Sequence, residues 1–209
     1  MVAYNWIHDN LSRGVGVGVY LDNAAGGYTI HHNVIWNIPS FGVSFSAALF
    51  VDSSGVTYTA NDNVAYNNTF YNNGSDVYVY DPARGADVRT MKGVNNIFTA
   101  TTKFPPGAVE QNNLHPPTDP LFVAASRNNF QLRSGSPAIN RGEQISGITG
   151  GFLGPAPDLG AYEFGAAGSI PVSVRWATVA PPGSSTSGRG HTLHCQAVMN
   201  TGTDAAAEK

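Results

Sequence analysis

Three aspartates recur in a similar local sequence, and their carboxyl groups could do acid–base chemistry. The four-residue segments that end in Asp22, Asp52 and Asp81 align without gaps, at intervals of 30 and 29 residues. If these segments lie on successive coils of stacked strands, neighbouring carboxyl groups are about 5 Å apart. Hydrolysis of a glycosidic bond needs a protonated acid and a base or nucleophile, and like charges this close raise at least one pKa. The spacing therefore predicts Asp22 and Asp52 as an acid–base pair, with Asp81 assisting.

The same three aspartates also fit two other roles. An aspartate at the end of a strand is a good turn starter, and all three are followed by turn-forming residues. Clustered carboxylates with backbone carbonyls would also form an oxygen site for Ca²⁺. Catalysis, turn formation and calcium binding stay open at this point, and no other cofactor is expected.

Histidine, aromatic and basic residues near these aspartates could complete a sugar site. His8 and His31 align in a 23-residue register, which predicts that His31 assists catalysis and His8 contacts substrate. Outward polar positions beside a turn are the alternative reading of both. Tyr20 and Trp36 are predicted sugar platforms, because sugar rings pack their C–H faces on aromatic planes, although inward stacking is also open. A uronate lyase would need a cation, for which Arg13 is the candidate; the histidines lack the spacing of a zinc site, so no metal site is predicted.

A recurring asparagine predicts the elements that position these residues. It returns in a similar frame, each time before an apolar or β-branched residue, at intervals of 23, 35, 28 and 17 residues. Its occurrences are Asn10, Asn33, Asn68, Asn96 and Asn113. Such spacing fits the coils of a solenoid whose loops absorb the differences in length, and residues 1–100 show no helical periodicity. The pattern predicts an all-β, right-handed parallel β-helix of four or five coils.

Within this β-helix, like side chains should stack on one another in the interior. The aligned segments place Ile7 on Ile30, and Val19 on Leu49. Asparagine suits the bends because it tolerates left-handed backbone angles and its amide can bond its neighbours.

Composition narrows the partners. Charged residues make up 12% of the chain and hydrophobic residues 42%, with a net charge of −3. There is no basic face for nucleic acid and no apolar run of membrane-spanning length. One cysteine, Cys195, excludes an intrachain disulfide. We therefore expect a monomer that binds polysaccharide, not nucleic acid or membrane.

The chain divides into three predicted regions. Residues 1–118 carry the β-helix coils, residues 119–165 form a closing module, and residues 166–209 are a linker-like or disordered tail rich in Ala, Gly, Ser, Thr and Pro. No secretory signal or cap precedes the first repeat-like residues, so we expect the solenoid to be truncated at its N-terminal end.

A family resemblance rests on several runs of sequence. "DPLF", "NFQL", "GSPAIN-RG" and "PDLGAYEF" resemble the closing module of bacterial β-helix proteins of the choice-of-anchor kind. "YNWIHDN", "GVYLDN", "IHHNVIWN" and "NNTFYNN" resemble the repeats of the same secreted group. The resemblance covers about three quarters of the chain and implies a secreted or cell-surface protein. The group spans polysaccharide lyases, glycoside hydrolases, epimerases and non-catalytic surface proteins, and its pectin-hydrolysing members carry aspartates on adjacent coils. This chain lacks their full motif set, so individual roles are not carried over.

The leading prediction is a polysaccharide-degrading enzyme, a glycoside hydrolase that uses the stacked aspartates. Two alternatives remain open from the sequence. One is a non-catalytic carbohydrate-binding or adhesion module, and the other is a lyase of uronate polysaccharides.

Overall fold

The protein is a stack of short parallel β-strands. The computed structural model describes residues 1–11, 16–21, 26–39, 47–52, 62–80, 91–104, 107–166 and 172–173. Within these residues there is no α-helix, and the single helical element is the 3₁₀ turn η2 (Ala125–Arg127). No helix in this part of the chain is long and apolar enough to cross a bilayer.

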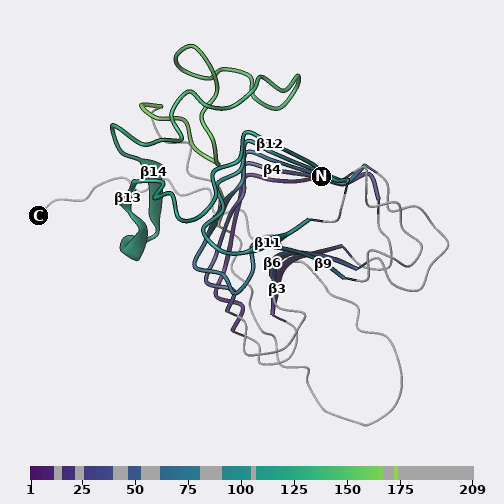
Figure 1. Ribbon diagram of the computed structural model, residues 1–209. Helices are drawn as coiled ribbons and strands as arrows, with labels where there is room; N and C mark the ends of the chain where they lie inside the picture. The colour runs from purple at the N-terminus through teal and green to yellow at the C-terminus, as the bar shows by residue number, and fades with distance from the viewer. Residues whose placement is uncertain are drawn as a thin grey trace, which may run out of the picture.

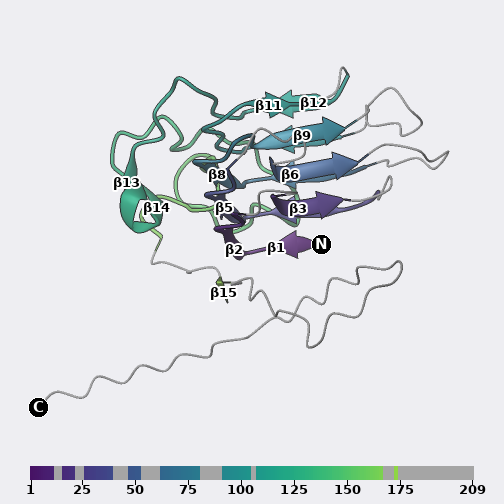
Figure 2. The same ribbon diagram turned by 90° about the horizontal axis from the view of Figure 1, so that it is seen from below.

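Three parallel sheets form the walls of the stack (Figures 1 and 2). Sheet A contains β1 (Val2–Ala3), β4 (Thr29–His31), β7 (Val64–Tyr66), β10 (Lys92–Val94) and β12 (Val109–Gln111). Sheet B contains β15 (Val172–Ser173), β2 (Asn5–His8), β5 (Val34–Trp36) and β8 (Thr69–Tyr71). Sheet C contains β3 (Val17–Leu21), β6 (Ala47–Asp52), β9 (Val77–Tyr80) and β11 (Thr102–Lys103). The chain visits A, B and C in turn, so the predicted parallel β-helix is confirmed.

Apolar side chains from the three sheets fill the interior of the coils. Val19 lies on Leu49 as predicted, but Ile7 pairs with Ile35 and not with Ile30. The expected stacking of Ile7 was wrong because Ile7 belongs to sheet B and Ile30 to sheet A. Burial of each such side chain contributes about 1.5–3 kcal/mol, so this column is the main stabilising feature of the coil.

A buried column of asparagines runs along the corner between sheets A and B. Asn33, Asn68, Asn96 and Asn113 occupy it as predicted, but the first coil contributes Asn5 and not Asn10, because Trp6 pairs with Val34. In each step the Oδ1 atom accepts hydrogen bonds from the backbone N and the Nδ2 of the asparagine one coil earlier, at 2.8–3.1 Å. The column therefore satisfies buried backbone groups at a corner where no strand pairing can do so.

The residue before each column asparagine has a left-handed backbone. These residues have positive φ angles of 49–60° and are Tyr4, His32, Asn67, Asn95 and Asn112. Asparagine adopts this conformation at lower cost than most side chains. The doublets Asn67-Asn68 and Asn95-Asn96 therefore combine a bend residue with a column residue.

The closing module lies along the side of sheet B (Figures 1 and 2). Its strands β13 (Phe122–Ala124) and β14 (Asn129–Leu132) pair antiparallel and contribute Phe122, Phe130 and Leu132 to a second apolar cluster. Backbone bonds fasten the module to the coils, among them Gly160 N to Asn95 O at 2.7 Å. Gly160 has a φ of +87°, and a Cβ there would lie 2.6 Å from Ile97, so this close approach needs glycine.

The predicted tail contributes one described strand. In β15, Val172 pairs with Asn5 and Ser173 with Trp6 at the outer edge of sheet B. The rest of residues 167–209 lies outside the described residues, so their predicted linker-like character stays a prediction.

Candidate functional site

The outer face of sheet C carries a row of residues that could hold a sugar chain. Tyr20, Phe50, Tyr78 and Lys103 occupy one register position on four successive strands. Tyr20 is 43% exposed, Tyr78 is partly buried, and the Lys103 Nζ lies 4.7 Å from the centroid of the Tyr78 ring. Their neighbours Val19 and Val77 are buried, as the two-residue alternation of a strand requires. The row therefore points away from the core.

The spacing of this row suits a polymer that lies along the stack. Stacked strands are about 4.8 Å apart, which is close to the length of one sugar residue in a chain. Aromatic planes pack on sugar C–H faces, and the ammonium group of Lys103 can bind a carboxylate or donate to hydroxyl oxygens. Of the predicted platforms, Tyr20 is placed where this role remains open.

The predicted aspartate column is wrong at its third step. Phe50 pairs with Tyr78 and Asp52 with Tyr80, so the interval between these two strands is 28 residues and not 29. A shift of one residue moves a side chain to the other face of a strand, so Asp81 is not the counterpart of Asp52. Asp22 and Asp81 lie outside the described residues, as does the side chain of Asp52. Their catalytic roles remain predictions.

The pair formed by Asp22 and Asp52 keeps partial support. Leu21 and Val51, which directly precede them, are paired in the 30-residue register that was predicted. The sequence alignment was correct for this first step because both segments enter the strand with the same pattern. It failed at the next step because "YVY" in residues 78–80 fits two registers one residue apart.

The two histidines of the predicted site do not lie together. His8 is on sheet B, where it pairs with Trp36, and His31 is on sheet A, where it pairs with Tyr66. The 23-residue register was therefore wrong. His31 is only 4% exposed, and its Nδ1 lies 3.0 Å from the Nδ1 of His32. Since it lies on another sheet than Asp52, it does not fit the predicted assisting role.

Burial also sets the charge state of this histidine pair. Desolvation lowers the pKa of His32 to about 4, with a smaller contribution from the neighbouring His31. Burial likewise lowers the pKa of His31, and the positive chain terminus adds to this shift. The Tyr4 ring stacks on His32 at 5.1 Å, so the pair forms a neutral, packed corner.

Trp36 is not available as a sugar platform. It is 4% exposed, its ring stacks on His8 at 4.1 Å, and Phe130 of the closing module packs against it at 5.2 Å. The prediction failed because the closing module covers this part of sheet B. His8 is partly buried and bonds Asp9 at 2.6 Å, so its predicted contact with substrate stays untested, and Arg13 lies outside the described residues.

No group of three or more histidine, cysteine, aspartate or glutamate side chains lies close enough to hold a metal among the residues that the structure describes. The calcium site considered for the aspartates falls on Asp22 and Asp81, which lie outside this part of the chain. It therefore remains a prediction.

Sequence analysis missed Asp76, a buried carboxylate at the bend that leads into sheet C. It is 0% exposed, and burial raises its pKa to about 6, although its hydrogen bonds act in the opposite direction. Its Oδ2 accepts hydrogen bonds from Thr99 N and Ala100 N at 2.8 and 2.7 Å, and its Oδ1 accepts one from Asn73 at 2.9 Å. The spacing of Asn73 and Asp76 is a turn signal, but their partners come from the next coil.

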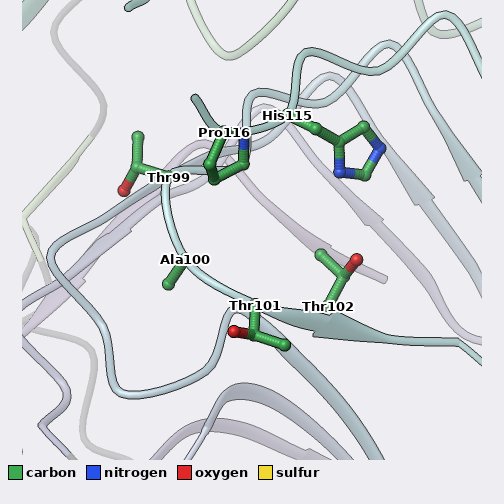
Figure 3. Close-up of a pocket in the computed structure, with 6 residues that line it drawn as sticks. All are labelled: Thr99, Ala100, Thr101, Thr102, His115 and Pro116. Carbon is green, nitrogen blue, oxygen red and sulfur yellow. The ribbon is translucent and has the colours of Figure 1, made fainter. Parts of the chain in front are cut away.

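Asp76 supports a hollow at the end of the stack (Figure 3). The hollow has a volume of about 410 Å³ and is lined by Thr99, Ala100, Thr101, Thr102, His115 and Pro116. Thr102 is the neighbour of Lys103, so the hollow adjoins the last position of the row on sheet C. Both Lys103 and His115 escaped the sequence analysis, because coils four and five have shorter intervals than the others.

Comparisons with known proteins agree with the fold. No protein-family model matches the chain, and no curated protein sequence matches it. Among solved structures, the chain is similar to the crystal structure of pectate lyase Pel9A, with 21% identity and a TM-score of 0.56. The match covers 78% of this chain and 44% of that one, so the chain spans less than half the length of the structure it matches. At this identity the likeness supports the parallel β-helix, and the resemblance to choice-of-anchor modules stays a prediction.

Proposed function

We propose that this chain belongs to a secreted polysaccharide-degrading protein that binds its glycan along the outer face of sheet C. The observation that carries the proposal is the outward row of Tyr20, Tyr78 and Lys103 on successive coils. A β-helix provides such a row at the repeat of a sugar chain, on a rigid surface. The fold shared with a pectate lyase is consistent with this class of substrate.

Within this class, hydrolysis by Asp22 and Asp52 is the first reaction that we propose. Both residues follow the aligned pair Leu21 and Val51, on the sheet that carries the row. Two carboxyl groups about 5 Å apart suit a retaining mechanism, in which one is the nucleophile and the other the acid and then the base. Asp81 no longer has a place in this reaction.

Elimination from a uronate is a second candidate, and a specific contact favours it. Lys103 is exposed and lies over the ring of Tyr78. Its cation could neutralise a substrate carboxylate, which makes the neighbouring C–H more acidic. A lyase would use Lys103 for this purpose and would need a base that the described residues do not identify.

The proposal is tested by incubating the full chain with a glycan panel and analysing the products by mass spectrometry. Hydrolysis is expected to release reducing ends, and this release should be lost in Asp52→Asn and in Asp22→Asn. Elimination would instead give an unsaturated product that absorbs in the ultraviolet and should be lost in Lys103→Ala.

Binding is measured in parallel with the same panel. Tyr20→Ala should weaken binding about tenfold through loss of ring stacking, with Tyr28→Ala as the control, an exposed tyrosine outside the row. Retention of intact glycan without any product would favour a non-catalytic binding module. If no glycan binds, or if Tyr20→Ala and Tyr28→Ala behave alike, the proposed site on sheet C is rejected.

A further inference from the structure

The hollow at the end of the stack has the properties of a second binding site. Coil five contributes β12 and the Leu114 bridge, but no fifth strand of sheet C is found among the described residues. The hollow lies where the turn 99–102 and the residues His115–Pro116 meet, with the latter above the turn in Figure 3. Its volume of about 410 Å³ falls within the range of small-ligand sites.

We propose that this hollow binds a neutral sugar residue, through the hydroxyl groups of Thr101 and Thr102 and the imidazole of His115. The inference rests on the proposed function, because the hollow would hold the residue that ends the glycan segment on sheet C. It assigns the protein a preferred position on its polymer, which the row on sheet C alone does not give.

The lining chemistry selects a polyhydroxyl ligand. No hydrogen bond to the hydroxyl of Thr101 or Thr102 is found within the described residues, so both remain able to donate and accept. The His115 ring offers one further nitrogen donor or acceptor, and Pro116 offers an apolar surface for C–H groups. Alternating hydroxyl and C–H surface is what a sugar ring presents.

The turn that carries the threonines is held rigidly, which favours binding. Asp76 accepts hydrogen bonds from Thr99 N and Ala100 N, while the Thr101 carbonyl accepts bonds from Asp76 N at 2.9 Å and the Ser75 hydroxyl at 3.0 Å. The Thr99 hydroxyl accepts a bond from Asn72 N at 3.2 Å. A site fixed in advance loses less conformational entropy when its ligand binds.

The other wall of the hollow is also fixed. The ring of His115 packs against Phe98 at 5.1 Å, and Phe98 N donates to Leu114 O at 2.9 Å. The His115 Nε2 lies 3.7 Å from the Glu110 carboxylate, and no lysine or arginine lines the hollow. A uronate carboxylate would therefore find a negative neighbour and no cation, so the site favours a neutral residue.

The position of the hollow connects it to the row on sheet C. Thr102 and Lys103 are the two residues of β11, with Lys103 as the outermost member of the row. One step further along the stack there is no strand of sheet C in the described part of the chain. A glycan on the row would therefore reach the hollow with its next residue.

The test uses the full chain and short neutral oligomers of galactose and of xylose, with oligogalacturonides as the charged comparison. Thr102→Val and His115→Ala should each weaken binding of a neutral oligomer about two- to tenfold, as expected for one hydrogen bond. Thr118→Val is the matched control, because Thr118 is exposed and does not line the hollow. Addition of the neutral oligomer should also shift the ring signals of His115 in NMR spectra.

The outcomes separate this inference from the proposed function. If Tyr20→Ala weakens binding while Thr102→Val and His115→Ala bind as the parent chain does, the sheet C site stands and the hollow is not a subsite. If oligogalacturonides shift the His115 signals more than neutral oligomers do, the neutral class is wrong. If no oligomer binds to the parent chain, both proposals fail.

Discussion

Sheets B and C both carry aromatic side chains on their outer faces, yet only one of these faces is open. On sheet B, Trp36 and Tyr71 lie against Phe122 and Phe130 of the closing module. On sheet C, Tyr20 is 43% exposed, and only Lys103 is recorded over the ring of Tyr78. Similar residues therefore stabilise the fold on one face and remain available to a ligand on the other.

The difference shows that the local sequence of a strand does not decide the role of its outward aromatics. Both rows alternate with buried aliphatic residues in the way a half-exposed strand requires. What separates them is a segment about 90 residues further along the chain, which folds back onto sheet B. Four variants can break or sharpen this comparison.

The largest effect is expected at Phe130, which is 1% exposed at the centre of the covered face. Phe130→Ala leaves a cavity against Trp36, Tyr71 and Phe122 and should lower the free energy of unfolding by about 3–5 kcal/mol. Urea denaturation followed by tryptophan fluorescence measures this change. Phe130→Leu, which fills most of the space, should cost much less, and equal losses in both variants would contradict the cavity argument.

The second effect concerns pH and the bend that leads into the open face. Burial raises the pKa of Asp76 from 3.8 to about 6, so the folded protein binds more protons than the unfolded chain between these values. This group therefore makes the protein less stable as the pH rises from about 4 to about 6, by about 3 kcal/mol at most. His32 acts in the opposite direction, because its lowered pKa of about 4 makes stability rise with pH up to about 6.5.

Asp76→Asn separates these two contributions, because the amide does not titrate. The difference in unfolding free energy between the parent chain and Asp76→Asn should change across this window, while the contribution of His32 cancels. Denaturant titrations at several pH values provide the measurement. A difference that stays constant with pH would show that the carboxyl group of Asp76 has an ordinary pKa.

A smaller effect is expected where the closing module bonds the first coil. Trp6 Nε1 donates a hydrogen bond of 2.8 Å to the hydroxyl of Tyr162. Tyr162→Phe removes the acceptor and should destabilise the protein by about 1 kcal/mol, with no change in glycan binding. Thermal unfolding measures the first quantity, and an altered glycan affinity would mean that the two faces are coupled.

The smallest effect on stability is expected at Tyr20 on the open face. Tyr20→Ala should change the free energy of unfolding by about 0.5 kcal/mol or less, because the side chain is exposed. The same variant should lose glycan affinity. A loss of stability comparable to that of Phe130→Ala would show that sheet C is packed like sheet B, and the comparison would fail.

The fold could be predicted from the sequence because its strongest signals are local. A doublet such as Asn67-Asn68 marks a bend residue and a column residue, and the same pair returns on the next coil. Steps with this doublet were placed correctly. The first step was misplaced, because Asn10 resembles a column residue while Asn5, within "YNW", lacks the preceding asparagine.

The site was harder to predict because it depends on register and on coverage. Asp81 was aligned with Asp52 although Tyr80 is the true partner, an error of one residue that changes the face of the sheet. Trp36 was expected on an open surface, but Phe130 covers it. Neither fact can be obtained from a short segment, since each depends on a partner in another coil or in the closing module.

The sequence alone determined that the chain winds into coils of parallel strands, because side-chain alternation and bend-forming asparagines act within a few residues. Only the tertiary structure decided which aromatic face stays open, since that depends on the docking of residues 119–164 onto sheet B. It likewise decided that the turn 99–102 is held by the Asp76 carboxylate. Hydrogen bonds and apolar contacts between distant segments are set by three-dimensional packing, and no local pattern encodes them.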